Sequence, residues 1–144
     1  MLTGLHLLLV EDTPLNAEVV GQIIRRAGAS FDLAIDGVAA IEAVRRVAYA
    51  LVLMDCQLPS VDGYEATRRI RAIEAAQGFE GPRRPRRLPI LALTACSMPD
   101  DVERARPAGM DDLLAKPIDA RRLLSAIGKH VSRDFLWSGS SVLD

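Results

Sequence analysis

The stretch Ala50-Leu51-Val52-Leu53-Met54-Asp55 decides the fold, because an unbroken apolar run ends in a carboxylate. Such a run is typical of a buried strand, which here carries Asp55 to its carboxyl end. A second run, Leu5–Val10, stops directly before the acids Glu11 and Asp12. If the two strands lie side by side in a parallel sheet, three carboxylates meet at one edge. A cluster of this kind repels itself unless a cation lies within it.

Two further apolar segments end in polar side chains that suit the same edge. Pro89–Leu93 is followed by the hydroxyl of Thr94. The short segment Leu113–Ala115 is followed by the ammonium of Lys116. We therefore expect the acids, a hydroxyl and an amine to lie along one edge of the sheet.

Helical patterns separate these strands. Pro14 suits the first turn of a helix and Gly28 its end. The apolar residues of this helix that we expect to face the sheet are Leu15, Val19, Ile23 and Ala27. Phe31–Ile35 alternates as a strand does, and the turn Asp36-Gly37 leads from it into a second helix. The apolar residues expected on that helix are Val38, Ile41, Val44 and Val47.

Three more helices complete the pattern. They are expected over Tyr64–Ala76, over Pro99–Arg106 and near the C-terminus. The inward-facing residues expected on the first of these helices are Ile70 and Ile73. Those expected on the last are Leu123, Leu124, Ile127 and Val131. Strand and helix then alternate five times, which predicts an α/β fold with parallel strands, right-handed crossovers and helices on both faces. In such sheets ligands bind outside the carboxyl ends of the strands, where the acids are expected.

Length and composition predict one domain. A chain of 144 residues with 49% hydrophobic content suits a single core, which we assign to residues 1–131. The tail, 132–144, is a linker to another domain, a docking strip or an artificial extension. The segment Gln77–Arg87 lacks any period and is expected to be an exposed, mobile connection far from the acids. Its arginine cluster, Arg83–Arg87, is interpreted as solvated.

Charge and cysteine content exclude several classes of protein. The formal net charge of −1 argues against a nucleic-acid-binding surface. No apolar stretch reaches the roughly 20 residues that a membrane helix needs, so we expect no membrane contact. Cys56 and Cys96 give no disulfide framework, which favours a reducing compartment and hence the cytoplasm. His6 and His130 show no metal-ligand spacing and are interpreted as structural or solvated.

The predicted edge has the parts that phosphoryl transfer requires: a nucleophile, a cation and fixed hydrogen-bond donors. Asp55 is the candidate nucleophile. Asp12 and Asp55 are candidate ligands of Mg²⁺, and Glu11 is a candidate to hold a water of that ion. Lys116 is expected to pair with the phosphoryl group. Thr94 is expected to donate its hydroxyl to a phosphoryl oxygen and so to move the loop behind it.

Five separated motifs, in order, resemble the receiver domain of two-component response regulators: Leu8–Asp12, Leu53–Pro59, Asp62-Gly63, Leu93–Ala95 and Lys116–Ile118. The resemblance covers roughly Leu5–Val131. It implies a flavodoxin-like three-layer sandwich with strand order 2-1-3-4-5. It also implies phosphoryl transfer from a phosphohistidine on a histidine kinase or a phosphotransfer protein, followed by slow self-dephosphorylation.

The same resemblance implies two details of the site. The backbone carbonyl of Gln57 is expected to join the Mg²⁺ ligands, and Lys116-Pro117 is expected to be a cis peptide bond. The segments Pro14–Asn16, Gln57–Pro59 and Glu65–Arg71 look most like receivers of hybrid histidine kinases. A free-standing receiver remains the alternative, and the sequence leaves the oligomeric state open.

One position departs from the family pattern. Many receivers carry Tyr or Phe three residues before the lysine, where this chain has Leu113. The sequence therefore leaves open a receiver-like interaction module that is regulated by binding alone. A phosphohydrolase that forms an aspartyl phosphate is disfavoured, because such enzymes need a second acid where this chain has Gln57. Simpler local roles also fit the sequence: Glu11 or Asp12 as the cap of the following helix, Asp62-Gly63 as a turn, and Cys56 as a small buried side chain.

Overall fold

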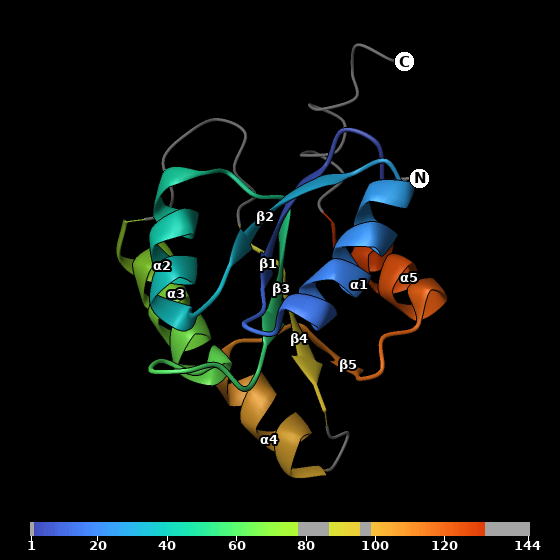
Figure 1. The fold of residues 1–144 in the computed structure, drawn as a ribbon. Coiled ribbons are helices and arrows are strands. Elements are labelled where there is room, and N and C mark those ends of the chain that lie inside the picture. Colours follow the sequence, from blue (N-terminus) through green and yellow to red (C-terminus); the bar gives the residue numbers. More distant parts are fainter. Residues whose placement is uncertain (1, 78–86, 96–98, 132–144) are drawn as a thin grey trace.

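The computed structural model of the protein describes residues 2–77, 87–95 and 99–131. These residues form five strands and five helices in strict alternation (Figure 1). The elements are β1 His6–Val10, α1 Pro14–Arg26, β2 Ser30–Ala34, α2 Gly37–Arg46, β3 Leu51–Asp55, α3 Gly63–Gln77, β4 Ile90–Thr94, α4 Pro99–Ala108, β5 Asp112–Ala115 and α5 Ala120–His130. The predicted alternation of strand and helix is confirmed.

The strands form one parallel sheet in the order β2-β1-β3-β4-β5, as predicted. The register between β1 and β3 matters most for the site. Val10 pairs with Met54, so Glu11 and Asp55, the next residues on each chain segment, lie at the same level. On the other side of β3, Asp55 pairs with Leu93, which precedes Thr94. The polar residues that end the strands are therefore collected at one edge.

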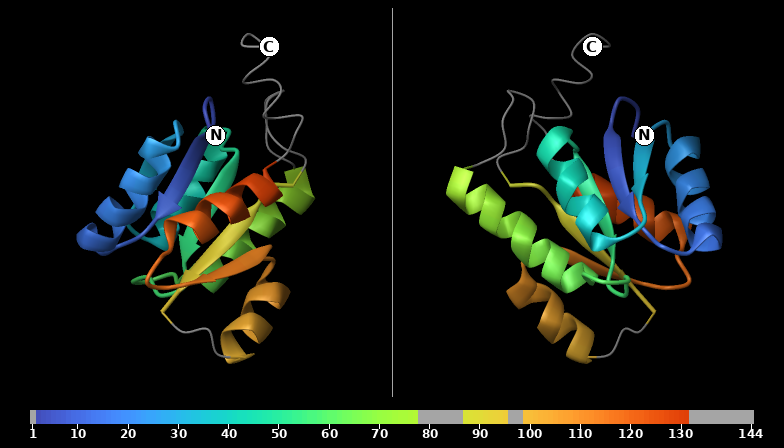
Figure 2. Two further views of the ribbon diagram at one scale, coloured as in Figure 1. Left: turned by 90° about the vertical axis from the view of Figure 1, so that its right-hand side faces the viewer. Right: turned by 60° about the vertical axis from the view of Figure 1, so that its left-hand side comes forward.

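The helices lie in two layers on either side of the sheet (Figure 2). One core cluster lies between the sheet and α1 and α5, and the other lies between the sheet and α2, α3 and α4. All five residues of β3 are buried, as are all five of β4. A strand covered on both faces needs apolar side chains at every position, which explains the unbroken run that ends at Asp55.

The inward face of α1 differs from the prediction. Leu15 is 71% exposed and Val19 is 46% exposed, so neither belongs to the core. Ala17, Val20 and Ile24 are buried in their place, while Ala27 is buried as expected. A spacing of four residues advances by about 400° around a helix, so a row of such residues drifts by about 40° at each step. In the row Leu15, Val19, Ile23 and Ala27, the first two residues therefore face solvent and the last faces the core.

The neighbouring elements show similar shifts. Asp36 caps α2 through a hydrogen bond from the backbone N–H of Ala39 to its side chain, at 2.7 Å. Val44 is buried as expected, but Val38 is 54% exposed and Ala40 takes its place in the core. Strand β2 lies at an edge of the sheet and ends before Ile35, which is 60% exposed. An edge strand has a neighbouring strand on one side only, so more of its residues stay exposed than the alternating pattern suggested.

A partly buried ionic cluster ties α3 to β4 and to the end of α4. The Arg71 guanidinium contacts Glu74 and Asp111, each at 2.8 Å, and its side chain is only 13% exposed. It also donates to the carbonyl oxygens of Gly109, at 2.9 Å, and Leu88, at 2.7 Å. These contacts hold the C-terminal end of α4 in place. The expected connection 77–87 and the tail 132–144 lie largely outside the described residues, as does Cys96.

The two histidines have structural partners, as expected. His6 contacts Asp32 at 3.0 Å, and its ring stacks on Tyr49 with 5.4 Å between centroids. His130 contacts Asp112 at 2.9 Å. Within the described ranges, no helix combines the length and the apolar character that crossing a bilayer would require.

Candidate functional site

The candidate residues lie at the carboxyl end of the sheet because each follows or ends a strand. Asp55 is the last residue of β3 and Thr94 the last of β4. Glu11 and Asp12 follow β1 directly, and Lys116 follows β5. Four separate segments thus place these five side chains along one edge, which is the arrangement that the sequence predicted.

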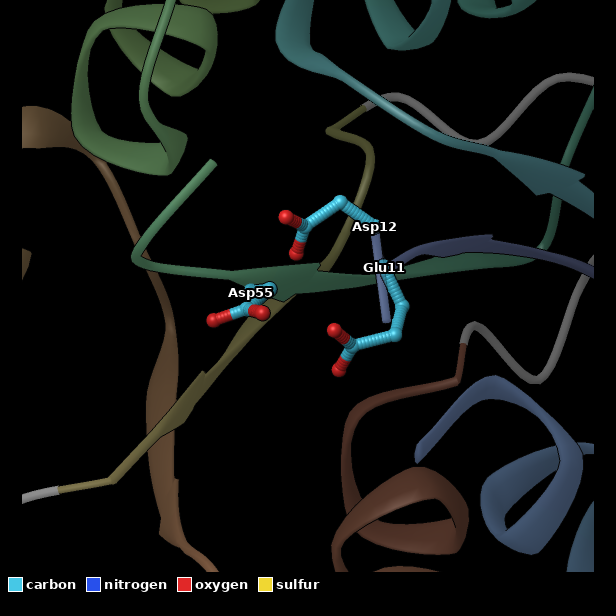
Figure 3. A group of neighbouring side chains, drawn as sticks. All are labelled: Glu11, Asp12 and Asp55. Atoms are coloured by element: carbon cyan, nitrogen blue, oxygen red, sulfur yellow. The ribbon is translucent and has the colours of Figure 1, made fainter. Parts of the chain in front are cut away.

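Three carboxylates form a compact cluster at the ends of β1 and β3 (Figure 3). One oxygen each from Glu11, Asp12 and Asp55 lies within 4.8 Å of the other two. Glu11 and Asp55 are buried, whereas Asp12 is exposed to solvent. Among the described residues this is the one group of acids, histidines and cysteines with the geometry of a metal site.

Lys116 links the two buried acids. Its Nζ lies 3.1 Å from Glu11 Oε1 and 3.1 Å from Asp55 Oδ2. Burial alone would lower the pKa of Lys116, but its contacts with Glu11 and Asp55 raise that pKa above the usual value. The lysine therefore stays charged in this site. Its preceding peptide plane is fixed by a hydrogen bond from Lys116 N–H to the Thr94 carbonyl, at 2.7 Å.

Glu11 is the member of the cluster whose negative charge is disfavoured by its surroundings. Its burial, followed by the proximity of Asp55, raises the pKa of this carboxyl above the usual value. The Lys116 ammonium and the backbone N–H of Thr13 lower that pKa, but they offset the rise only in part. A buried acid whose charge is opposed by its surroundings is stabilised by a nearby cation.

An open cleft of about 740 Å³ runs beside the cluster. Its lining includes five of the six predicted site residues: Asp12, Asp55, Gln57, Thr94 and Lys116. The backbone N–H of Gln57 donates to Asp55 Oδ1 at 3.1 Å, which orients that carboxylate. The cleft wall also contains residues that the sequence pattern did not assign to the site: Asn16, Tyr64 and Arg104.

The wall formed by the start of α3 is closely packed. Asp62 accepts a hydrogen bond from the backbone N–H of Glu65 at 2.9 Å, so Asp62-Gly63 forms the turn into α3 that the sequence suggested. A methyl group at Gly63 would overlap the backbone oxygen of Asp55. Glycine is therefore required where α3 approaches the end of β3.

Several other predictions concern the same region. Lys116-Pro117 is a cis peptide bond, as the family resemblance implied. Cys56 is buried, at 3% exposure, in agreement with a packing role. Neither Glu11 nor Asp12 caps α1: the N-cap residue is Thr13, and Glu11 accepts the Thr13 backbone N–H at 3.2 Å. Leu113 is half-buried and packs against the core cluster beneath α2, α3 and α4.

The cluster fits a small divalent cation that prefers oxygen ligands. Glu11, Asp12 and Asp55 offer carboxylate oxygens within the reach of one ion. Carboxylates and carbonyls suit Mg²⁺ and Ca²⁺, and the cluster that the described residues form contains neither a cysteine nor a histidine, the ligands that favour zinc or copper. A cation would also relieve the burial of charge at Glu11. With a cation, the edge would present the Asp55 carboxylate beside fixed positive charge.

The chain matches known proteins over nearly its whole described length. A family model for the response regulator receiver domain matches residues 7–128. A curated relative, the hybrid signal transduction histidine kinase B of Dictyostelium discoideum, is 40% identical over 129 residues. That alignment covers 88% of this chain but 7% of the kinase. The chain spans between 7% and 15% of the length of eight such relatives.

Two solved structures share both fold and sequence with the chain. The receiver domain of the sensor histidine kinase PA1611 from Pseudomonas aeruginosa superposes with a TM-score of 0.76 at 39% identity, covering 89% of this chain and 98% of that one. It carries a magnesium ion in its active-site cleft. The receiver domain of Ssk1 from Saccharomyces cerevisiae, solved with the phosphotransfer protein Ypd1, gives a TM-score of 0.82 at 30% identity, with coverage of 95% and 99%.

Proposed function

The chain belongs to the family of response regulator receiver domains, and we propose that it accepts a phosphoryl group on Asp55 in a Mg²⁺-dependent phosphorelay. One observation carries this proposal. The Nζ of Lys116 lies 3.1 Å from Asp55 Oδ2 and 3.1 Å from Glu11 Oε1, beside a cluster of three acids. Nucleophile, fixed ammonium and cation site thus share one edge of the sheet.

The transfer step is a displacement at phosphorus. A carboxylate oxygen of Asp55 forms a bond to the phosphorus atom while the bond from phosphorus to the imidazole nitrogen of the donor histidine breaks. The electron pair of that bond leaves with the imidazole nitrogen. Glu11, Asp12, Asp55 and the backbone carbonyl of Gln57 are the proposed holders of Mg²⁺. A bound Mg²⁺ would neutralise charge that develops on the phosphoryl oxygens.

Lys116 and Thr94 have distinct proposed roles. Lys116 stays charged at neutral pH, because its contacts with the two buried acids raise its pKa. It can transfer one of those contacts to a phosphoryl oxygen without a large movement. Thr94 ends β4 in the same cleft and can donate its hydroxyl to another phosphoryl oxygen. A hydroxyl drawn toward the phosphoryl group would move the chain that leads to α4.

Loss of the phosphoryl group is expected to be slow. Hydrolysis requires a water molecule in line with the acyl phosphate and a group that takes its proton. Gln57, two residues after Asp55, has an amide that cannot serve as a general base. The same residue disfavours a phosphohydrolase. We propose that the domain holds the phosphoryl group long enough to pass it on or to signal through it.

The proposed donor is a protein that carries a phosphohistidine. The relative from Dictyostelium discoideum is named as a hybrid kinase, and the Ssk1 receiver was solved with a phosphotransfer protein. The surface of this chain also suits a protein partner. Leu15 and Val19 of α1 are exposed, and they line an apolar cleft of about 230 Å³ next to Lys116 and Ile118. A small apolar cleft beside the acids can receive an apolar side chain of a protein donor.

Comparing a protein donor with a small one tests this proposal. A phosphorylated histidine phosphotransfer protein should label the chain in the presence of Mg²⁺, and so should acetyl phosphate. Leu15→Ser should slow labelling by the protein donor while leaving acetyl phosphate labelling unchanged. Val38→Ser is the matched control, because Val38 is also exposed but does not line the apolar cleft.

Each competing function gives a different result. Rapid turnover of phosphomonoesters without a stable adduct would indicate a phosphohydrolase. Failure of native protein to accept a phosphoryl group from either donor would indicate an interaction module that is regulated by binding. The observation that favours such a module is Leu113, which stands where many receivers carry Tyr or Phe.

A further inference from the structure

Arg104 is a cation of the cleft with no part in the acid cluster. It lies on α4 and lines the same cleft as Asp55, Thr94 and Lys116. Its side chain is 58% exposed, so the guanidinium is in contact with solvent at the wall of the cleft. None of the five receiver motifs of the sequence contains this arginine.

The guanidinium is held only loosely. Its carbon lies 4.1 Å from the centroid of the Tyr64 ring, and its Nη2 lies 3.9 Å from Asp62 Oδ2. That distance is at the outer limit of an ion pair, and exposed pairs of this kind contribute little to stability. Asp62 is itself fixed at the start of α3, and Tyr64 is buried. Arg104 therefore rests on a rigid surface that it can leave at low cost.

The backbone that carries Arg104 is anchored. Gly109, just after α4, accepts hydrogen bonds from Arg71 at 2.9 Å and from Arg87 at 3.1 Å. The Arg71 side chain is largely buried. Because α4 is fixed at this end, the reach of Arg104 into the cleft is set by its side chain.

The negative charge in the cleft suggests why a second cation, besides Lys116, is needed to bind a phosphoryl group. The cleft and its floor contain the acids Glu11, Asp12, Asp55 and Asp62 against the cations Lys116 and Arg104. Mg²⁺ would offset the excess of negative charge, but the donor then adds a phosphoryl group of about −1.5 to −2. Lys116 already contacts two acids, at 3.1 Å each. Within the described residues, Arg104 has only a long contact with one acid, Asp62, at 3.9 Å. Its planar guanidinium can bind two phosphate oxygens at once.

We propose that Arg104 binds the phosphoryl group of the incoming donor, moving away from Tyr64 and Asp62 as it does so. The inference rests on the proposed function and adds a binding residue to it. It requires only that an arginine at the cleft wall exchanges a weak carboxylate contact for a phosphate contact. The ligand chemistry is a phosphoryl dianion, whether carried by a histidine or by a small molecule.

Labelling kinetics with acetyl phosphate test the inference on the full chain. In Arg104→Gln, the donor concentration for half-maximal rate should rise about tenfold, the equivalent of about 1.4 kcal/mol, while the maximal rate stays within twofold. The difference should shrink as salt is added, because the contact is exposed. Arg106→Gln is the matched control. Arg106 is an exposed arginine on the same helix that lies outside the cleft, so this variant should behave as wild type.

Metal binding provides a second readout that a purely structural role would not change. Removing a positive charge near the acids should tighten Mg²⁺ binding in Arg104→Gln by a few-fold and leave the melting temperature in chelator unchanged. Equal half-saturation in wild type and Arg104→Gln would overturn the inference, as would an equal loss in Arg106→Gln. A lower maximal rate together with a lower melting temperature would show that Arg104 only holds α4 in place. Absence of labelling in the wild-type chain would refute the proposed function and the inference with it.

Discussion

Asp12→Asn should change the stability of the protein in opposite directions without and with Mg²⁺. The substitution keeps the shape of the side chain and removes one of three charges whose oxygens lie within 4.8 Å of one another. Without metal, this charge is repelled by Glu11 and Asp55. With metal, the same charge is a ligand. The variant should therefore be more stable than wild type in chelator and less stable in excess Mg²⁺.

The expected size of each effect follows from the geometry. Two unit charges 4.8 Å apart interact by about 0.9 kcal/mol in bulk water and by about 3.5 kcal/mol at an effective dielectric constant of 20. Asp12 is exposed, so the lower value applies to each of its two pairs. Since Lys116 offsets part of this repulsion, we expect a gain of about 1 kcal/mol, or roughly 4 °C in melting temperature for a domain of this size.

The metal response is set by mass action. Mg²⁺ at ten times its dissociation constant should stabilise wild type by about 1.4 kcal/mol, or roughly 5 °C, and at a hundred times by about 2.7 kcal/mol. Thermal unfolding monitored by circular dichroism across a Mg²⁺ titration measures both effects. Glu18→Gln is the control, because it removes an exposed acid of α1 that lies outside the cluster. A melting response to Mg²⁺ in Asp12→Asn that equals that of wild type would refute the placement of the metal.

Further predictions concern the other parts of the structure. In chelator, Glu11→Gln should be more stable than wild type at neutral pH. Burial raises the pKa of Glu11, which means that the ionised form of this side chain weakens the fold. The gain in stability should vanish as the pH falls below the usual pKa of a glutamate, because the carboxyl is then protonated in both the folded and the unfolded chain. A gain that persists at low pH would contradict this cause. Gly63→Ala should unfold the protein at a lower temperature and prevent labelling, since its methyl group would overlap the backbone oxygen of Asp55, the proposed phosphoacceptor. Gly128→Ala, which has open space around it in α5, should stabilise by about 0.5–1 kcal/mol, and equal effects of the two substitutions would be inconsistent with the packing described. Arg71→Ala should cost about 1–3 kcal/mol in urea unfolding, because it removes the guanidinium that Glu74 and Asp111 share and leaves these partly buried carboxylates with fewer hydrogen bonds. Loss of the exposed arginine in Arg46→Ala should change stability by less than about 0.5 kcal/mol.

The edge of the sheet could be predicted from the sequence because two simple rules determine it. A strand that is apolar at every position is buried on both faces, and parallel strands end at the same edge. Those rules alone predict that Asp55, Glu11, Thr94 and Lys116 lie together. The family resemblance added the strand order and the cis bond before Pro117, which periodicity cannot supply.

The faces of the helices and the wall of the cleft were harder to predict. On α1, the row that begins at Leu15 and the row that begins at Ala17 are both compatible with helical spacing, and only packing against the sheet decides between them. The contact of Arg104 with Tyr64 depends on how α4 packs on α3, which the local sequence does not specify. The ionic cluster of Arg71 joins residues that are up to 40 positions apart in the chain. Interactions of this kind follow from the fold and have no short-range signal.

Mapping the modified residue decides whether Asp55 is the phosphoacceptor. The chain is incubated with acetyl phosphate and Mg²⁺, digested, and analysed by mass spectrometry, beside Asp55→Asn treated in the same way. We expect one added phosphoryl group on Asp55 that is lost in acid and in base, and none on the variant, whose circular dichroism spectrum should match that of wild type. A phosphoryl group on another residue, or an adduct that persists in the folded variant, would show that Asp55 is not the acceptor.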